Sequence, residues 1–506
     1  MIRPYRFLPV LTVLLTGCVT LGPDFASPGW NGPGSWFGNG KARAPLSETT
    51  EAPIDPAWWT LFRDAKLTAL AARVATENPD LAISAMRIEQ SRAHVDAARA
   101  LGMPGLNAST SYTRQKASNF GQFGVNANAL GANGTNGSTA GATGTRTLSE
   151  FDVYQIGFDA SWEIDLWGKL RRNLEAAGAT TRASEETRRG LLLASLAEVA
   201  RDYIVLRGVQ TQLRIARENA QIARDSLKLT QQRAAGGVTT NLDVATASSQ
   251  LNTVLARIPA LEQQEGQLIN ALSLLVGMPP GGLRAELAFP RAVPPVPPRV
   301  PIGLPSDLAR RRPDIRQAEA SLHAATAEIG VAKAAFFPSF RLVGSMGLQS
   351  TQFHKLFDLG ARQFATGPGL TIPLFEAGQL RAQLRLTEAR QKEAALAYQK
   401  TVLSALHEVD NALTAYRSEQ TRRQRLADAV AENRRALELS RARYAQGVTD
   451  FLTVLDAQRN LLANELLLAD SITAVSSNLV VLYKALGGGW EADLPDTRVS
   501  PQKRAS

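Results

Sequence analysis

The chain has 506 residues, a formal net charge of +10, an aromatic content of 6% and one cysteine. That length suffices for three or four ordinary domains, and a single cysteine excludes an internal disulfide. The scattered Arg and Lys residues alternate with Glu and Asp without a dense basic run, which argues against nucleic-acid binding, and the low aromatic and high alanine content favours long, closely packed helices.

Residues 1–17 are predicted to be a signal peptide. Two arginines precede an apolar run from Phe7 to Leu15, which is too short to cross a bilayer. The Leu-Thr-Gly-Cys string that ends at Cys18 is similar to a bacterial lipobox, so we expect Cys18 to be lipidated and to anchor the chain. An ordinary signal with a chance cysteine is the alternative. Thr20, in place of Asp, indicates sorting to the outer membrane, and no other stretch reaches about 18 apolar residues, so no transmembrane helix is expected.

The sequence is duplicated. Residues 168–277 and 378–487 align without a gap at an offset of 210. Solenoid repeats are ~20–50 residues long, so a period of this length indicates a duplicated half-molecule. Further upstream, the Asn-Pro-Asp-Leu string at 78–81 matches Arg-Pro-Asp-Ile at 312–315. We therefore expect two similar halves about a pseudo-symmetry axis, which suggests a tube or a channel.

Each half carries two predicted strands. Apolar and polar residues alternate in 154–166 and 340–348, and more weakly in 106–112 and 364–374. A soluble sheet with one buried face usually explains such alternation, but the strand length and the expected lipid anchor favour a membrane barrel. The first half has 24 extra residues, and the segment from 120 to 145, rich in Gly, Asn, Thr and Ala, is predicted to be an exposed loop.

Four strands cannot close a barrel, because about eight is the minimum for a filled one. A trimer would supply twelve strands, which is enough for an open lumen. The strand count therefore predicts that the barrel is shared between subunits.

Long helices follow the strands. Residues 168–234 and 378–444 contain no proline, and each run would be ~100 Å long if continuous. Each run ends near a glycine, and second helical runs at 243–276 and 450–486 return. We expect two antiparallel helical hairpins per subunit, arranged by three subunits into a cylinder. An ordinary coiled coil is the alternative, but it does not explain the strands.

An ordered set of strings resembles the TolC-like outer membrane factor family, in its lipoprotein branch typified by OprM and NodT. The strings are Cys18…Gly22-Pro23-Asp24-Phe25, Trp58-Trp59 with Phe62 and Asp64, Trp162 to Gly168, Arg311 to Ile315, Tyr444…Gly447, Leu455 to Arg459, and Tyr483 to Trp490. The match covers nearly the whole mature chain. It implies an α+β membrane protein: a trimeric twelve-strand outer-membrane β-barrel, with four strands per chain, continuous with a long periplasmic α-helical barrel.

The resemblance also implies a function. It indicates the outer-membrane channel of a tripartite efflux pump, a passive exit duct for drugs or other small toxic compounds. The homotrimer would dock with a periplasmic adaptor protein and an inner-membrane RND-type pump. An outer-membrane channel for type I protein secretion and a coiled-coil lipoprotein without a pore are the alternatives.

The domain boundaries expected on this basis follow the chain. They are a signal peptide (1–17), a lipidated segment with an equatorial wrap (18–67), a helix (68–104), strands 1 and 2 with their loop (105–167), hairpin 1 (168–277), a Pro-rich equatorial linker (278–310), a helix (311–338), strands 3 and 4 (339–377), hairpin 2 (378–487) and a tail (488–506).

The resemblance places a periplasmic gate near the hairpin tips. The family positions that match Leu452, Asp456 and Arg459 form a constriction, and a ring of carboxylates there would attract cations and repel itself. From the residues alone, an i,i+3 ion pair between Asp456 and Arg459 is the alternative. Tyr444 reaching Asp243 would form a latch between the hairpins. Asp243 is replaced by a threonine in the second half, and this asymmetry fits a latch between unlike hairpins.

The tips themselves are the predicted adaptor-docking surface. Its residues are Gly237, Val238, Thr239, Gly447, Val448 and Thr449. Glycine also supplies the backbone conformation that ends a helix, and both roles are compatible. Some members of the family carry a basic residue at the position of Thr449, so a less tightly held gate is expected here.

No enzyme is predicted. The four histidines, His94, His323, His354 and His407, show no metal-ligand spacing with acids or cysteine. There is no Gly-rich phosphate loop before a Lys-Ser/Thr pair, so energy must come from a partner. We expect no cofactor beyond the covalent lipid on Cys18.

Overall fold

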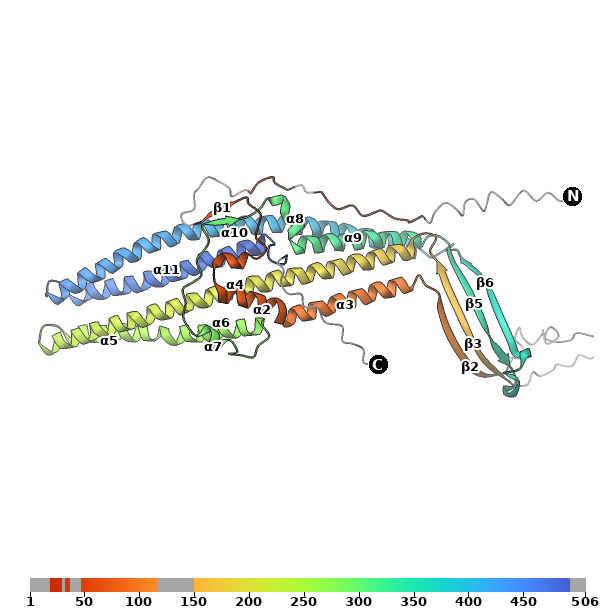
Figure 1. Cartoon of the computed structure of the whole chain (residues 1–506), viewed down its shortest axis with the longest axis horizontal. Helices are drawn as coiled ribbons and strands as arrows, with labels where there is room; N and C mark the ends of the chain where they lie inside the picture. The colour runs from red at the N-terminus through yellow and green to blue at the C-terminus, as the bar shows by residue number, and fades with distance from the viewer. Residues whose placement is uncertain (1–18, 30–31, 37–46, 117–149, 492–506) are drawn as a thin grey trace, which may run out of the picture. The chain divides into compact units, whose positions relative to one another are not determined.

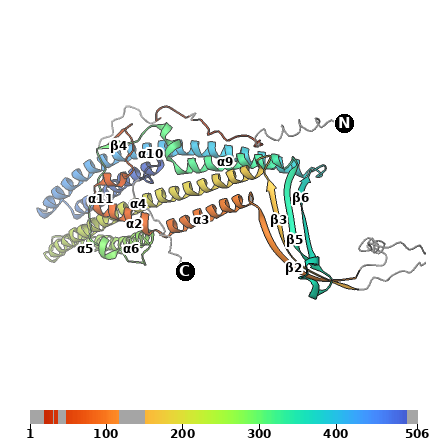
Figure 2. The ribbon, with the colours of Figure 1, turned by 45° about the vertical axis from the view of Figure 1, so that its right-hand side comes forward.

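The structure is a computed structural model that describes residues 19–29, 32–36, 47–116 and 150–491. The chain divides into two compact units. The sheet unit contains residues 1–25, 93–178 and 324–391. The helical unit contains residues 26–92, 179–323 and 392–506. Figures 1 and 2 show the four long strands of the first unit and the paired helices of the second.

The sheet unit holds one antiparallel sheet in the order β2-β3-β5-β6. Its strands are β2 (Gly105–Gln115), β3 (Phe151–Ile164), β5 (Ser339–Ser350) and β6 (Arg362–Thr371). The short 3-10 turns η4 (Phe353–Lys355) and η5 (Leu359–Ala361) connect β5 to β6. All four predicted strands are confirmed, including the two with the weaker pattern. The predicted loop at 120–145 lies outside the described residues.

The register places most of the large apolar residues of the four strands on one face. Phe158 pairs with Ala108 and Met346, and Met346 pairs with Phe364. Within a single chain, Phe158, Met346 and Phe364 are 55%, 70% and 82% exposed. Paired residues point to the same face, so the intervening odd positions form a polar face, where Asp159 accepts from Ser109 and Glu163 pairs with Arg341.

The two longest helices confirm the predicted runs. Helix α4 (Lys169–Ala235) and helix α10 (Gln379–Ala445) contain 67 residues each. Helix α11 (Phe451–Ala485) returns from α10 as predicted, and these two helices form hairpin 2. In the first half, α5 (Asn241–Leu255) and α6 (Arg257–Leu275) return from α4 and complete hairpin 1 (Figure 1).

The single run predicted at 243–276 is wrong, because it breaks at Ala256. Pro259 has no amide hydrogen, so the carbonyl of Leu255 loses its helical partner and is crowded by the proline ring. The helix therefore restarts at Arg257.

The helix predicted at 68–104 is also two helices, α2 (Ala65–Glu77) and α3 (Pro79–Ala100). Asn78 between them has an extended backbone, as expected for a residue before proline. Its side-chain oxygen accepts from the amides of Asp80 and Leu81 and caps α3. In the second half, α9 (Pro313–Ala334) likewise begins at a proline and confirms the helix predicted there.

The segment predicted as a Pro-rich linker contains short elements. They are α7 (Arg284–Leu287), β4 (Arg299–Pro301), η3 (Pro305–Asp307) and α8 (Leu308–Arg311). Strand β1 (Glu48–Thr50) pairs with β4 in parallel, and the 3-10 helix η1 (Trp58–Phe62) follows β1.

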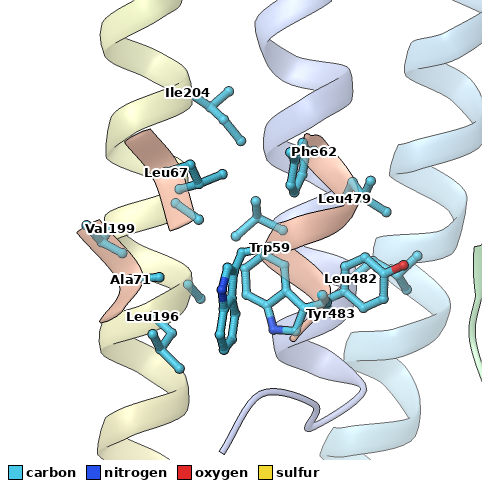
Figure 3. Packing of buried hydrophobic residues seen from close by; sticks show 14 of the residues in the cluster. Trp59, Phe62, Leu67, Ala71, Leu196, Val199, Ile204, Leu479, Leu482 and Tyr483 are labelled. Atoms are coloured by element: carbon cyan, nitrogen blue, oxygen red, sulfur yellow. The ribbon is translucent and has the colours of Figure 1, made fainter. Parts of the chain in front are cut away.

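These elements share the main hydrophobic core of the helical unit (Figure 3). Trp58 is fully buried, stacks on Tyr483 with ring centroids 5.4 Å apart, and donates its indole N–H to the carbonyl of Gly488 at 3.0 Å. Burial also raises the pKa of Tyr416 in this core to about 12. The aromatic residues of η1 thus tie the N-terminal segment to α11.

Helix α11 is long and apolar enough, by length and composition, to cross a membrane. No stretch of this length and composition is expected after the signal peptide, and α11 departs from that expectation. Within one chain, 44% of its most apolar window is buried, and Val475, Leu479 and Leu482 belong to the core. Packing within one chain thus accounts for part of its apolar character.

The segment after Cys18 docks within the sheet unit, although Cys18 itself lies outside the described residues. The amide of Leu21 donates to the carbonyl of Trp167 at 3.1 Å. Arg172, only 4% exposed, donates to the carbonyl of Leu21 at 3.2 Å and pairs with Asp24 at 2.5 Å. This short N-terminal strap is therefore fixed beside the first turn of α4.

Two glycines pair at the centre of the sheet and generate a prediction. Gly157 is directly opposite Gly347, and a Cβ added at Gly347 would lie 2.5 Å from the carbonyl oxygen of Ile156. We expect Gly347→Ala to push β3 and β5 apart and to reduce the yield of folded protein in the membrane. Gly367→Ala is the matched control, because a Cβ at Gly367 meets no atom within 4 Å. Equal yields of the two variants would contradict this reading.

Candidate functional site

Both hairpins turn through the same backbone geometry. Gly237 and Gly447 have φ angles of 73° and 77°, a left-handed conformation that glycine adopts without strain. The amide of Val238 donates to the carbonyl of Arg233 at 2.9 Å, and that of Val448 to the carbonyl of Arg443 at 3.0 Å. These bonds define a Schellman end, so the turn chemistry expected for the tip glycines is present in both halves.

The turns leave apolar side chains uncovered. Val238 and Val448 are 65% and 68% exposed, and Leu242 and Leu452 are 74% and 55% exposed. Four large apolar side chains at two neighbouring tips form a surface of the kind that proteins use for docking.

The returning helices are capped by reciprocal residue pairs. In hairpin 1, Thr240 is the N-cap and Asp243 closes a capping box with it. In hairpin 2, Asp450 is the N-cap and accepts from the amide of Thr453 at 3.1 Å and from its hydroxyl at 2.7 Å. Thr240 corresponds to Asp450, and Asp243 to Thr453, at the offset of 210. The threonine and the aspartate thus exchange positions between the two caps, and each helix keeps a capping pair. This exchange explains the difference between Asp243 and Thr453, which was expected to mark a latch.

Both cap carboxylates are charged at neutral pH. Hydrogen bonds from the side chain of Thr239, and then from Thr240, lower the pKa of Asp243. Hydrogen bonds from Thr453 lower the pKa of Asp450, and the nearby charge of Asp243 opposes that shift slightly. Each tip thus carries one negative charge at the N-terminus of a helix, where the helix dipole favours it.

Arg233 joins the two tips. Its guanidinium donates to the carbonyl of Tyr444 at 2.6 Å and to that of Ala445 at 3.4 Å. It also lies 4.6 Å from the centre of the Tyr444 ring. Cations near the end of a helix interact favourably with its unpaired carbonyls, so Arg233 of hairpin 1 stabilises the end of α10 in hairpin 2.

Tyr444 is packed inside hairpin 2. It is 4% exposed, and its ring lies 5.7 Å from that of Phe451 inside hairpin 2. Its hydroxyl is buried without a hydrogen-bond partner among the described residues, while the carboxylate of Asp243 is occupied by Thr239 and Thr240. The two groups share no hydrogen bond within one chain of the described structure, and the latch from Tyr444 to Asp243 stays a prediction.

A row of hydrogen bonds continues from Arg233 between the hairpins; we call this contact the within-chain seam. Arg459 donates to Gln250 at 2.9 Å and Gln458 to Ser226 at 2.5 Å. Further bonds join Arg441 to the carbonyl of Ile222, Asn219 to Glu465, and Gln212 to Asp470. The two hairpins of one chain are thus held together by polar side chains over several helical turns.

The three predicted constriction residues lie on the first turns of α11. Asp456 is exposed and makes no hydrogen bond or ion pair within the described parts of the chain. The ion pair of Asp456 with Arg459 is wrong, since Arg459 reaches Gln250 instead. The role of Leu452 and Asp456 in a constriction stays a prediction. In the described ranges, no group of three or more His, Cys, Asp or Glu side chains could hold a metal ion.

Sequence reasoning missed Arg233, Phe451 and Asp450. Asp450 could have been found, because the exchange of Thr240 for Asp450 is visible at the repeat offset. Arg233 and Phe451 act through contacts between helices, which the spacing of residues within one hairpin does not reveal.

Comparisons with known proteins agree with this architecture. The family model described as outer membrane efflux protein matches residues 70–278 and 304–488. The outer membrane protein OprJ of Pseudomonas aeruginosa is 34% identical, with 95% of each chain covered. The toluene efflux pump outer membrane protein TtgC of Pseudomonas putida is 33% identical, with 96% of this chain and 95% of the relative covered.

Solved structures show the same likeness. The outer-membrane channel OprN has a TM-score of 0.82 at 31% identity, with 94% of this chain and 100% of that chain covered. The outer membrane channel MtrE of Neisseria gonorrhoeae, solved in its open state, has a TM-score of 0.72 at 27% identity, with 95% of this chain and 100% of that chain covered.

The contact of Arg233 generates a prediction about the tips. We expect Arg233→Ala to speed hydrogen exchange of the amides at 444–450, because hydrogen bonds to a charged group contribute about 1.5–3 kcal/mol. That loss corresponds to at least roughly tenfold faster opening. Arg435→Ala is the control, since Arg435 is exposed on α10 and its side chain makes no bond among the described residues. Unchanged exchange in Arg233→Ala would remove Arg233 from this role.

Proposed function

The chain belongs to the outer membrane efflux protein family and is an efflux channel of the outer membrane, and we propose that three copies form one passive exit duct. In this proposal the duct is joined in the periplasm by an adaptor protein and an inner-membrane pump of the RND type. The observation that carries the proposal is a four-stranded sheet with two open edges and one uncovered apolar face.

The open edges support the trimer. Strands β2 and β6 are each paired on one side only. In lipid no water can satisfy the free backbone groups of an edge, and each unsatisfied group costs several kcal/mol. Pairing β6 of one copy with β2 of the next removes every edge. Three copies supply twelve strands, and a barrel of twelve strands is wide enough for a lumen.

The two faces of the sheet support a water-filled duct. The apolar face, with Phe158, Met346 and Phe364, suits contact with lipid chains. The opposite face, with Asp159, Glu163 and Arg341, suits a wet lumen. A wall of this kind selects little beyond size and charge, so the pump supplies both energy and selection.

Small toxic compounds are the proposed cargo. TtgC is named for toluene efflux and ArpC of Pseudomonas putida for antibiotic efflux, and both relatives match this chain over almost its whole length. Their names support a duct for compounds of this size. We propose no preference among such compounds.

The exposed valines of the tips support adaptor docking there. Val238 and Val448 occupy equivalent places in the two hairpins, so an adaptor with repeated contacts would find the same turn twice. The footprint consists of Gly237, Val238, Thr239, Gly447, Val448 and Thr449. An adaptor that binds the open tips more tightly than the closed tips shifts the equilibrium towards the open state.

The strap supports a lipid anchor on Cys18. Thr20 lies close to Gly168, since a Cβ added at Gly168 would approach its backbone to 2.9 Å, and the anchor would therefore leave the protein next to the end of β3. We expect the purified mature chain to begin at Cys18 and to carry acyl groups, which intact-mass measurement detects. A mature chain that begins elsewhere, or lacks acyl mass, would contradict the anchor.

Two variants separate the gate from the docking surface. In three copies the exposed Asp456 side chains would form a carboxylate ring, so Asp456→Ala is expected to raise leak conductance and to lower cation selectivity in planar bilayers. It should leave adaptor binding intact. A double variant, Val238→Asp with Val448→Asp, is expected to abolish adaptor binding and leave the cation selectivity of the isolated channel unchanged.

Each variant is the control for the other. Unchanged conductance and selectivity in Asp456→Ala would remove Asp456 from the gate. Normal adaptor binding by the double valine variant would remove the tips from the docking surface. An absence of any conductance in the unmodified protein would overturn the proposed duct.

A further inference from the structure

The within-chain seam has a counterpart that one chain cannot form alone. In a ring of three copies, hairpins 1 and 2 alternate, so hairpin 2 has its own hairpin 1 on one flank and hairpin 1 of the next copy on the other. The repeat at an offset of 210 relates the two kinds of contact. The residues that would meet at the contact between copies, the between-chain seam, can therefore be read from the within-chain seam. This step rests on the proposed trimer.

Arg443 is the counterpart of Arg233 at that seam. It is exposed, and its side chain makes no hydrogen bond or ion pair within the described residues. Arg233 and Arg443 each occupy the last turn of a 67-residue helix, and the backbone carbonyl of each accepts from the valine of its own turn. The two guanidinium groups thus start from the same place on equivalent helices.

The receiving carbonyls also have counterparts. Arg233 binds the carbonyls of Tyr444 and Ala445, and these positions correspond to Ala234 and Ala235 at the end of α4. The carbonyl of Tyr444 already accepts from Gly447 at 2.9 Å, and the carbonyl of Ala234 accepts from Gly237 at 3.0 Å. A carbonyl has two lone pairs, so Ala234 retains capacity for a second donor, as Tyr444 does.

Three of the five other seam contacts lose one or both polar partners at the repeat positions. Ser226 and Asn219 of hairpin 1 correspond to Ala436 and Ala429 of hairpin 2. Asp470 and Glu465 of hairpin 2 correspond to Ala260 and Leu255 of hairpin 1. The other two contacts keep polar groups on both sides, but their donors are uncharged. Gln231 takes the place of Arg441 in one, and Ser249 and Asn460 take the places of Arg459 and Gln250 in the other. At the between-chain seam Ala234 stands in the place of Tyr444. Arg443 therefore has no counterpart of the aromatic ring that lies beside Arg233.

We propose that Arg443 docks on a second copy of this chain and donates to the carbonyls of the partner's Ala234 and the partner's Ala235. This contact is the principal polar contact of the between-chain seam at the tips, because its donor keeps the positive charge.

Cysteine pairs test the docking. Arg443→Cys with Ala235→Cys places thiols on both sides of the between-chain seam, and Arg233→Cys with Ala445→Cys does the same for the within-chain seam. The only native cysteine is Cys18, and the single variants measure its background. After treatment of membranes with a short bismaleimide, we expect bands of two and three copies from the first pair and only single-copy bands from the second.

The outcomes distinguish the inference from the proposed function. If the first pair gives single-copy bands while an amine-reactive cross-linker still gives three copies, the Arg443 contact is wrong and the trimer stands. If the amine-reactive cross-linker gives no oligomer either, the proposed trimer fails. Bands of two and three copies from the second pair would contradict the assignment of the two seams.

Leak conductance tests the contact without a cross-linker. Arg443→Ala should increase leak conductance several-fold, whereas Arg435→Ala should not, and equal leaks would overturn the contact.

Discussion

The unpaired backbone of β2 and β6 is the constraint on which the rest of the assembly depends. Hydrocarbon offers no hydrogen-bond partner, so a sheet that spans lipid must close on itself. One chain supplies four strands, which is too few to close. Closure between copies follows, and it requires the apolar positions to share one face and the polar positions the other. The paired glycines at 157 and 347 allow the two central strands to approach closely.

The internal duplication accounts for most of the remaining architecture, including the two hairpin tips. The same glycine turn and the same valine occur at both tips, and the caps are preserved by exchanging Thr240 and Asp243 for Asp450 and Thr453. The halves differ in what supports each tip, because hairpin 2 has Tyr444 and Phe451 in its core where hairpin 1 has Ala234 and Asn241. This difference makes the two seams unequal.

Much of the fold could be predicted from the sequence, because alternation and proline-free runs are local patterns. The four strands, α4, α10 and α11 follow them closely. The breaks at Asn78 and Ala256 depend on single prolines inside longer helical patterns, and a pattern averaged over many residues does not reveal them. The tip site was predicted only in part. Its glycine turns and the partners of Asp243 are local, whereas the latch from Tyr444 to Asp243 is implied only by the resemblance. The contacts of Arg233 and Tyr444 depend on packing between helices. Arg233 and Arg443 occupy equivalent places before the same Gly-Val-Thr turn, and only the structure shows that Arg233 reaches the other hairpin of its own chain.

The most direct test of the central claim is the number of chains in the purified channel. Static light scattering of the protein in detergent, corrected for bound detergent, gives the protein mass of the assembly. The account predicts three copies of a chain whose full-length mass is 54.4 kDa, reduced by the signal peptide. A stable monomer or dimer that still conducts in planar bilayers would contradict it, since four or eight strands do not close a barrel with an open lumen.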